Sequence, residues 1–114
     1  MFLSEKQAQF LQDVALLIQY VNSFEGMYLT GGELHRPPEV QELFREKGKS
    51  LTNQGQHQSR LAIDLFLFVD GQVTWDSKDY EFMGEFWESL RKENRWGGHF
   101  QNITDAVHFE RRSV

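Results

Sequence analysis

Aliphatic side chains alternate with a second, mixed set along residues 61–69 of this chain. The odd positions are all aliphatic, and the even positions include one acid: Leu61, Ile63, Leu65, Leu67 and Val69 against Ala62, Asp64, Phe66 and Phe68. This period of two predicts a β-strand with a buried aliphatic face. Asp64 therefore points away from that face, and a carboxylate in such a run is costly unless a cation or a hydrogen-bond donor meets it.

Apolar residues at helical spacing predict a first helix over residues 5–23. Ser4, with Gln7 three residues later, fits a capping box that would begin this helix. The stripe that we expect in the core consists of Phe10, Val14, Leu17, Ile18 and Val21.

Two further helices are predicted from their first residues. Pro37 and Pro38 open a helix over residues 38–46, because a proline in the first turn loses no hydrogen bond. A third helix follows the possible caps Asp76, Ser77 and Asp79. Its expected core face is Tyr80, Met83, Phe86, Trp87 and Leu90.

Short β-prone segments complete the picture. Asp70 and Gly71 form a strong hairpin signal between the strand at 61–69 and a partner at 72–75. We also expect strands at residues 27–30 and 106–110, and loops at 47–56 and 94–104. The sequence therefore predicts one α+β domain, residues 1–114, in which two or three helices pack on a small, mainly antiparallel sheet.

The composition excludes several classes of protein. The 114 residues have a net charge of −5, and the only dense basic clusters are 91–92 and 111–112, so we expect no nucleic-acid partner. No apolar run is long enough to span a bilayer, and the N-terminus lacks an export signal, so we expect no membrane insertion. Cysteine is absent, which leaves four histidines and the carboxylates to hold any metal.

His57, Asp64 and His108 are the candidate metal ligands. A catalytic zinc ion commonly has three protein ligands and one water, whose pKa it lowers to about 7. A further carboxylate must then transfer protons, and Asp105 is the nearest in sequence to a proposed ligand. The alternative on residue types alone is an Asp64 paired with Arg60 or Arg36 and two surface histidines.

Three motifs together resemble the M15 family of zinc peptidases. They are His57-x-x-Arg60-x-Ala62-x-Asp64, Trp96-Gly97-Gly98 and Asp105-x-x-His108-Phe109. The resemblance implies that His57, Asp64 and His108 bind Zn²⁺ and that Asp105 is the general base and acid when the zinc-bound water attacks the amide. It also implies the fold of Hedgehog proteins and D-Ala-D-Ala peptidases.

Other positions extend or depart from the resemblance. Arg36 stands in a segment similar to the one in which the family has a substrate-facing arginine. Gly55 replaces the usual serine that helps to hold the substrate. Arg60 replaces the usual glycine, which suggests either a backbone without a glycine conformation or an added cation at the cleft. Glu110 either hydrogen-bonds a ligand histidine or is an exposed acid. We expect His99 to lie at the surface or behind a ligand rather than to bind the metal.

The expected function is zinc-dependent cleavage of peptidoglycan stem peptides by a monomeric phage endolysin that cuts L-Ala–D-Glu bonds. Without a signal sequence, such an enzyme would stay in the host cytoplasm and reach the cell wall through a pore made by another protein. The alternatives are a D-Ala-D-Ala carboxypeptidase or dipeptidase, and a non-catalytic, zinc-stabilised phage structural module.

Overall fold

A computed structural model describes residues 1–32 and 60–112 of the chain. The predicted helix at 38–46 and the predicted loop at 47–56 lie outside these residues. The described elements are α1 (Leu3–Asn22), β1 (Met27–Gly31), β2 (Ala62–Val69), β3 (Gln72–Val73), α3 (Ser77–Leu90), β4 (Asn94–Trp96), the 3₁₀ helix η1 (Gly97–His99) and β5 (His108–Arg111). They form an α+β fold, as predicted.

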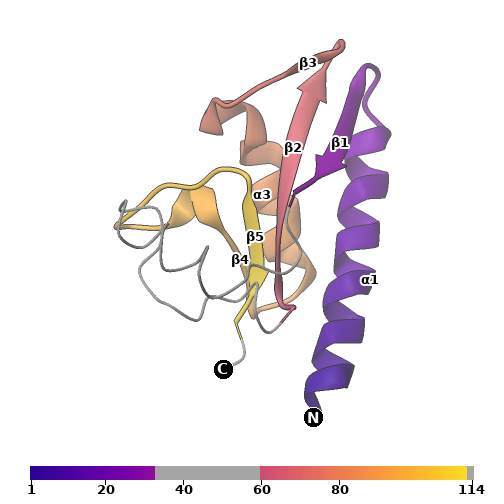
Figure 1. Ribbon diagram of the computed structural model, residues 1–114, viewed down its shortest axis with the longest axis vertical. Helices are drawn as coiled ribbons and strands as arrows, with labels where there is room; N and C mark the ends of the chain where they lie inside the picture. Colours follow the sequence, from indigo (N-terminus) through magenta and orange to yellow (C-terminus); the bar gives the residue numbers. More distant parts are fainter. Residues whose placement is uncertain (33–59, 113–114) are drawn as a thin grey trace.

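The strands form a five-stranded sheet in the order β1-β2-β5-β4, and β3 pairs with the far end of β2 (Figure 1). Every pairing is antiparallel. The central strand β2 is long enough to pair with β5 through its first residues, Ala62 to Asp64, and with β3 through Phe68 and Val69. One edge of β2 therefore has two neighbours, one at each end.

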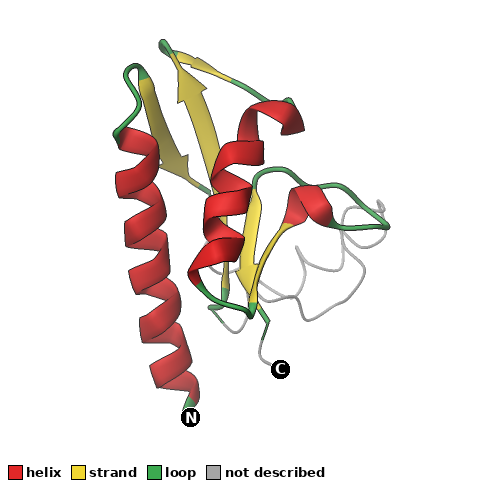
Figure 2. Ribbon diagram, turned by 180° about the vertical axis from the view of Figure 1, so that it is seen from behind, coloured by secondary structure: helices red, strands yellow, loops and turns green. Residues whose placement is uncertain are grey.

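Helix α3 covers one face of the sheet, and α1 packs against α3 and β1. The sheet lies in front of α3 in Figure 1, and α3 lies in front of the sheet in the opposite view of Figure 2. The core between these layers contains the aliphatic side of β2, as predicted, together with aromatic rings from the helices. Its fully buried side chains include Leu17, Leu61, Leu67, Tyr80, Met83, Trp87 and Phe109.

The first helix begins two residues before the predicted start. Ser4 is not its cap, because the helix starts at Leu3 and the Glu5 carboxylate accepts a hydrogen bond from the Phe2 backbone N–H at 2.9 Å. Ile18 is 37% exposed, so it does not belong to the core stripe. The buried stripe includes Asp13 instead, which the sequence did not indicate.

The hairpin and the third helix follow their sequence signals. Asp70 and Gly71 have φ angles of 52° and 85°, the positive values that a tight two-residue hairpin turn requires. The predicted strand at 72–75 is shorter than expected, although the Thr74 N–H still donates to Leu67 O at 2.9 Å. Asp76 caps α3 by accepting a hydrogen bond from the Lys78 N–H at 3.0 Å.

The prediction of a loop over residues 94–104 was wrong, because β4 and η1 lie within it. Tertiary contacts stabilise β4: the buried Asn94 amide donates to Asp13 Oδ2 and Trp87 O, and Glu88 accepts from the Trp96 N–H at 3.0 Å. The last strand is His108–Arg111, shifted from the predicted 106–110. Among the described residues, neither helix is both long and apolar enough to cross a membrane.

Candidate metal centre

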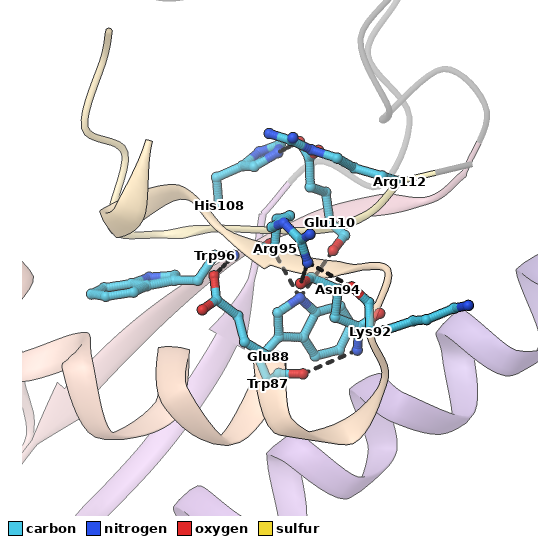
Figure 3. Close-up of polar contacts among 9 residues, drawn as sticks. All are labelled: Trp87, Glu88, Lys92, Asn94, Arg95, Trp96, His108, Glu110 and Arg112. Atoms are coloured by element: carbon cyan, nitrogen blue, oxygen red, sulfur yellow. Dashed lines mark hydrogen bonds and ion pairs between the residues drawn. The ribbon is translucent and has the colours of Figure 1, made fainter. Parts of the chain in front are cut away.

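The sheet face that points away from the core holds the candidate site. Asp64 lies between the buried residues Ile63 and Leu65 of β2, so its side chain leaves the strand on the opposite face. His108 of β5 is its direct cross-strand partner, and such partners project to the same face. In Figure 3, His108 and Glu110 lie on one side of the sheet and Trp87 lies on the other.

The donor atoms of three residues converge. His108 Nδ1 lies 3.4 Å from Asp64 Oδ1. Two ligands at about 2.1 Å from a tetrahedral zinc ion are themselves about 3.4 Å apart, so this pair has the spacing of adjacent zinc ligands. One oxygen of Asp105 joins them, since one donor atom from each of the three residues lies within 4.8 Å of the others. The nitrogen and oxygen donors fit a divalent ion such as zinc.

The Asp105-x-x-His108 spacing corresponds to a turn. The His108 N–H donates to Asp105 O at 3.1 Å, an i to i+3 hydrogen bond. The turn brings both side chains to the start of β5, and the Leu65 N–H donates to Val107 O at 2.8 Å beside them. Two residues between the acid and the histidine are therefore enough to close the turn that holds them together.

Gly97 fixes the position of this turn from the other side. The Asp105 N–H donates to Gly97 O at 3.0 Å. A Cβ atom at position 97 would lie 2.0 Å from Asp105 O and 3.0 Å from the His108 Cβ. Only glycine allows the η1 backbone to come this close, so the Trp96-Gly97-Gly98 motif has a direct structural link to Asp105.

Glu110 orients the candidate histidine ligand. Its Oε1 lies 2.7 Å from His108 Nε2, and its Oε2 accepts a hydrogen bond from Arg112 Nε at 3.3 Å (Figure 3). Of the two alternatives for Glu110, contact with a candidate ligand is the one observed, and the side chain is not an exposed acid. This contact occupies Nε2 and leaves Nδ1 facing Asp64.

Electrostatics favour a charged His108 in the absence of metal. Burial lowers the pKa of His108, but hydrogen bonds with Asp64 and Glu110 outweigh burial and raise that pKa from 6.5 to about 9. Burial raises the pKa of Glu110, whereas His108 and then Arg112 lower it by more, so the net shift is downward. The metal-free site thus holds an imidazolium between carboxylates, and a cation binding at Nδ1 must displace a proton.

The other predicted site residues divide into two groups. His57, Arg36 and Gly55 lie outside the described residues, so their roles stay predictions. Arg60 is described, and its φ of 59° lies in the left-handed region. The suggestion that arginine here indicates a backbone without a glycine conformation was therefore wrong, because the chain retains that conformation. His99 is at the surface as expected, with Nδ1 3.0 Å from Glu88 Oε1.

Comparisons with known proteins give a family and a similar fold. Residues 47–111 match the sequence profile of an M15 peptidase family described as D-alanyl-D-alanine carboxypeptidase. The fold is similar to that of ChiX, an L-Ala D-Glu endopeptidase of Serratia marcescens, with a TM-score of 0.76 and 20% identity over 92% of this chain and 79% of that one. No curated protein matches the sequence. The family profile covers more than half of the sequence, and the chain belongs to the M15 family of peptidases.

Proposed function

We propose that this chain is a zinc-dependent peptidase that cleaves L-Ala–D-Glu bonds in the peptide stems of peptidoglycan. The observation that supports the proposal most directly is the convergence of Asp64, Asp105 and His108 within 4.8 Å on the sheet face opposite the core. A structural ion pair needs one acid for one histidine, whereas His108 has three carboxylates close to it, those of Asp64, Asp105 and Glu110. That surplus of acceptors suits a divalent cation and a proton carrier.

Each residue has a separate role in this proposal. Asp64 Oδ1 and His108 Nδ1 would hold zinc together with His57. A bound zinc ion supplies a Lewis acid that polarises the peptide carbonyl and lowers the pKa of a water molecule. Glu110 keeps the His108 ring in place through Nε2, so that Nδ1 faces Asp64.

Asp105 would be the general base and then the general acid. Its carboxylate takes the proton of the attacking water and returns it to the leaving amine. The turn from Asp105 to His108 holds that carboxylate beside the metal ligands, which reduces the reorganisation needed before reaction. Arg36 would bind a substrate carboxylate or the oxyanion that forms on the peptide carbonyl.

A second candidate function is removal of the terminal D-Ala from stem peptides, which the description of the matching family profile favours. Gly55 stands where the sequence resemblance leads us to expect serine, and such an enzyme must hold a free C-terminal carboxylate. The similarity to ChiX and the loss of that hydroxyl support the endopeptidase over the carboxypeptidase.

We also propose a phage lysis role, with folding in the host cytoplasm and release through a pore; the sequence resemblance alone supports it. The cleavage reaction is tested by digesting purified Gram-negative sacculi and identifying the new peptide termini by mass spectrometry. New L-Ala C-termini and D-Glu N-termini that disappear with a chelator are the expected result. Release of D-Ala would support the carboxypeptidase, and zinc-loaded protein without any cleavage would refute both enzymes in favour of a zinc-stabilised structural module.

Variants separate metal binding from proton transfer. His57→Ala and His108→Ala should lose both zinc and activity. Asp105→Ala should keep zinc and lose turnover by about 10²–10⁴-fold, as expected for a positioned acid or base. His99→Ala is the matched control, because its imidazole lies at the surface with Glu88 and should affect neither measurement. Full activity of the Asp105 variant would exclude this residue from the mechanism.

A further inference from the structure

The sheet face of the metal centre continues into a row of aromatic side chains. Phe66 and Phe68 follow Asp64 at two-residue intervals along β2, so all three project to the same face. Tyr28 of β1 is the cross-strand partner of Phe68, and the two rings stack with centroids 5.1 Å apart. Trp75, just beyond β3, packs against Phe66 with centroids 5.6 Å apart.

These four residues, Tyr28, Phe66, Phe68 and Trp75, form what we call the aromatic face. The core does not account for it, because the core of this fold lies on the other side of the sheet. Trp75 is 66% exposed and Tyr28 is 43% exposed, large values for rings that bury well elsewhere in this protein. Phe66 and Phe68 are half-buried between them. A contiguous group of apolar rings that reaches the surface of a sheet commonly marks a binding surface.

The aromatic face lies within reach of the proposed scissile bond. A strand rises about 3.3–3.4 Å per residue, which places Phe66 roughly 7 Å and Phe68 roughly 14 Å from Asp64 along β2. In a stem peptide, L-Ala and the lactyl group that joins it to the glycan separate the L-Ala–D-Glu bond from the nearest sugar ring. One extended residue spans at most about 3.6 Å and the lactyl group is of similar length, so that ring must lie within roughly 7 Å of the scissile bond during cleavage.

We propose that the aromatic face binds the glycan strand of peptidoglycan, with sugar rings stacked on Trp75 and Tyr28. The apolar C–H faces of a pyranose ring match the flat, electron-rich faces of exposed indole and phenol rings. The inference rests on the proposed function for its choice of polymer. It goes further in giving the enzyme affinity for the carbohydrate, and it predicts a preference for stems that are still attached to sugar.

A binding measurement tests the glycan contact without any need for catalysis. The probe is peptide-free glycan strands, prepared by releasing the stems from sacculi with an amidase, and the readout is co-sedimentation or calorimetry. Wild-type protein should bind, and Trp75→Ala or Tyr28→Ala should weaken binding about five- to tenfold. Trp75→Tyr keeps an aromatic ring and should restore most of the affinity.

Phe2→Ala is the matched control, because Phe2 is an even more exposed ring, 78% accessible, at the start of α1 and lies outside both sites. It should leave glycan binding and cleavage unchanged. A kinetic comparison completes the test: wild-type protein should have a higher kcat/KM for disaccharide-linked stems than for free stem peptides. Trp75→Ala should bring the ratio of these two values close to one.

The two proposals fail in different ways. Cleavage of sacculi without binding to glycan strands, and with equal kcat/KM for the two soluble substrates, would overturn the glycan inference and leave the peptidase standing. Glycan binding that requires Trp75, in a protein without cleavage, would support the inference and refute the proposed function. A dimer in solution that Trp75→Ala dissociates, with no glycan binding, would assign the aromatic face to a second copy of the chain and overturn the inference.

Discussion

Replacing Gly97 with alanine should displace Asp105 without unfolding the protein. The added Cβ would lie 2.0 Å from Asp105 O, whereas ordinary contacts begin near 3.4 Å, so one of the two segments must move by about 1 Å or more. Overpacking of this kind costs about 1–3 kcal/mol of stability. A displacement of about 1 Å at a catalytic group costs roughly 10²-fold in rate. We therefore expect a folded Gly97→Ala protein with kcat lowered about 100-fold.

The assay combines turnover on soluble disaccharide-stem substrate, zinc content per chain and thermal unfolding. Gly31→Ala is the neutral control, because nothing lies within 4 Å of a Cβ at that position and its backbone conformation is ordinary. Gly84→Ala is the steric control: its Cβ would lie 2.2 Å from the Trp96 ring, which is linked to the turn after Asp105 by a hydrogen bond from Nε1 to Ala106 O, whereas the Gly97 Cβ would press on Asp105 itself. Gly84→Ala should lose stability with a smaller loss of turnover.

Three results would overturn this reasoning about Gly97. A Gly97→Ala protein with wild-type kcat would mean that the η1 backbone does not position Asp105 for catalysis. Equal losses of kcat in the Gly97 and Gly84 variants, at equal stability, would mean that general overpacking explains the effect. Loss of zinc at wild-type stability would point instead to displacement of His108, whose Cβ lies 3.0 Å from the added atom.

The structure also predicts the direction of three changes in stability. In chelator-treated protein, the stability that protonated His108 contributes should be fully present just below pH 6.5. About 3 kcal/mol of it should be lost as pH rises from 6.5 through about 9, the raised pKa of His108. Urea unfolding of wild type and Glu110→Gln over this pH range measures the loss, and a flat wild-type profile would contradict it. Arg60→Gly should raise stability by about 0.5–1 kcal/mol, because arginine at a φ of 59° is strained. Denaturant unfolding measures the change, and a loss of stability would show that Arg60 makes compensating contacts. Asp13→Ala should lower the free energy of unfolding by about 2–3 kcal/mol, because it removes the hydrogen-bond acceptor of Arg91 and Asn94. The control Gln12→Ala changes an exposed side chain and should have little effect. Equal losses in the two variants would rule out these hydrogen bonds as a source of stability.

The sequence predicted those parts of the fold whose signals are local. The hairpin at Asp70 and Gly71 needs only two residues with positive φ, and the Asp76 cap needs only its own side chain and the next turn. The sequence also predicted which side chains of β2 face the core. Side chains alternate between the two faces of a strand, so burial of the aliphatic set places Asp64 and the phenylalanines on the opposite face.

The parts that the sequence did not predict depend on partners far away in the chain. The sequence of β4 is typical of a loop. Asn94 can be buried in a strand because Asp13, 81 residues away in the chain, accepts its hydrogen bond. Asp13 itself interrupts an apolar stripe, and nothing near it in the sequence indicates Arg91 as its ion-pair partner. The conformation of Arg60 is a backbone property that the surrounding turn imposes, and residue type alone gave the wrong expectation.

The core of this protein also determines the geometry of its candidate site. A shift of one residue in the register of β2 would bury Asp64 and expose its aliphatic neighbours. Leu61, Leu65 and Leu67 are each at most 2% exposed, and burying each side chain contributes about 1.5–3 kcal/mol. The core therefore strongly opposes such a shift in register. Asp64 and His108 meet because apolar residues on the opposite face hold β2 in one register, so the packing of the core brings these two candidate ligands together.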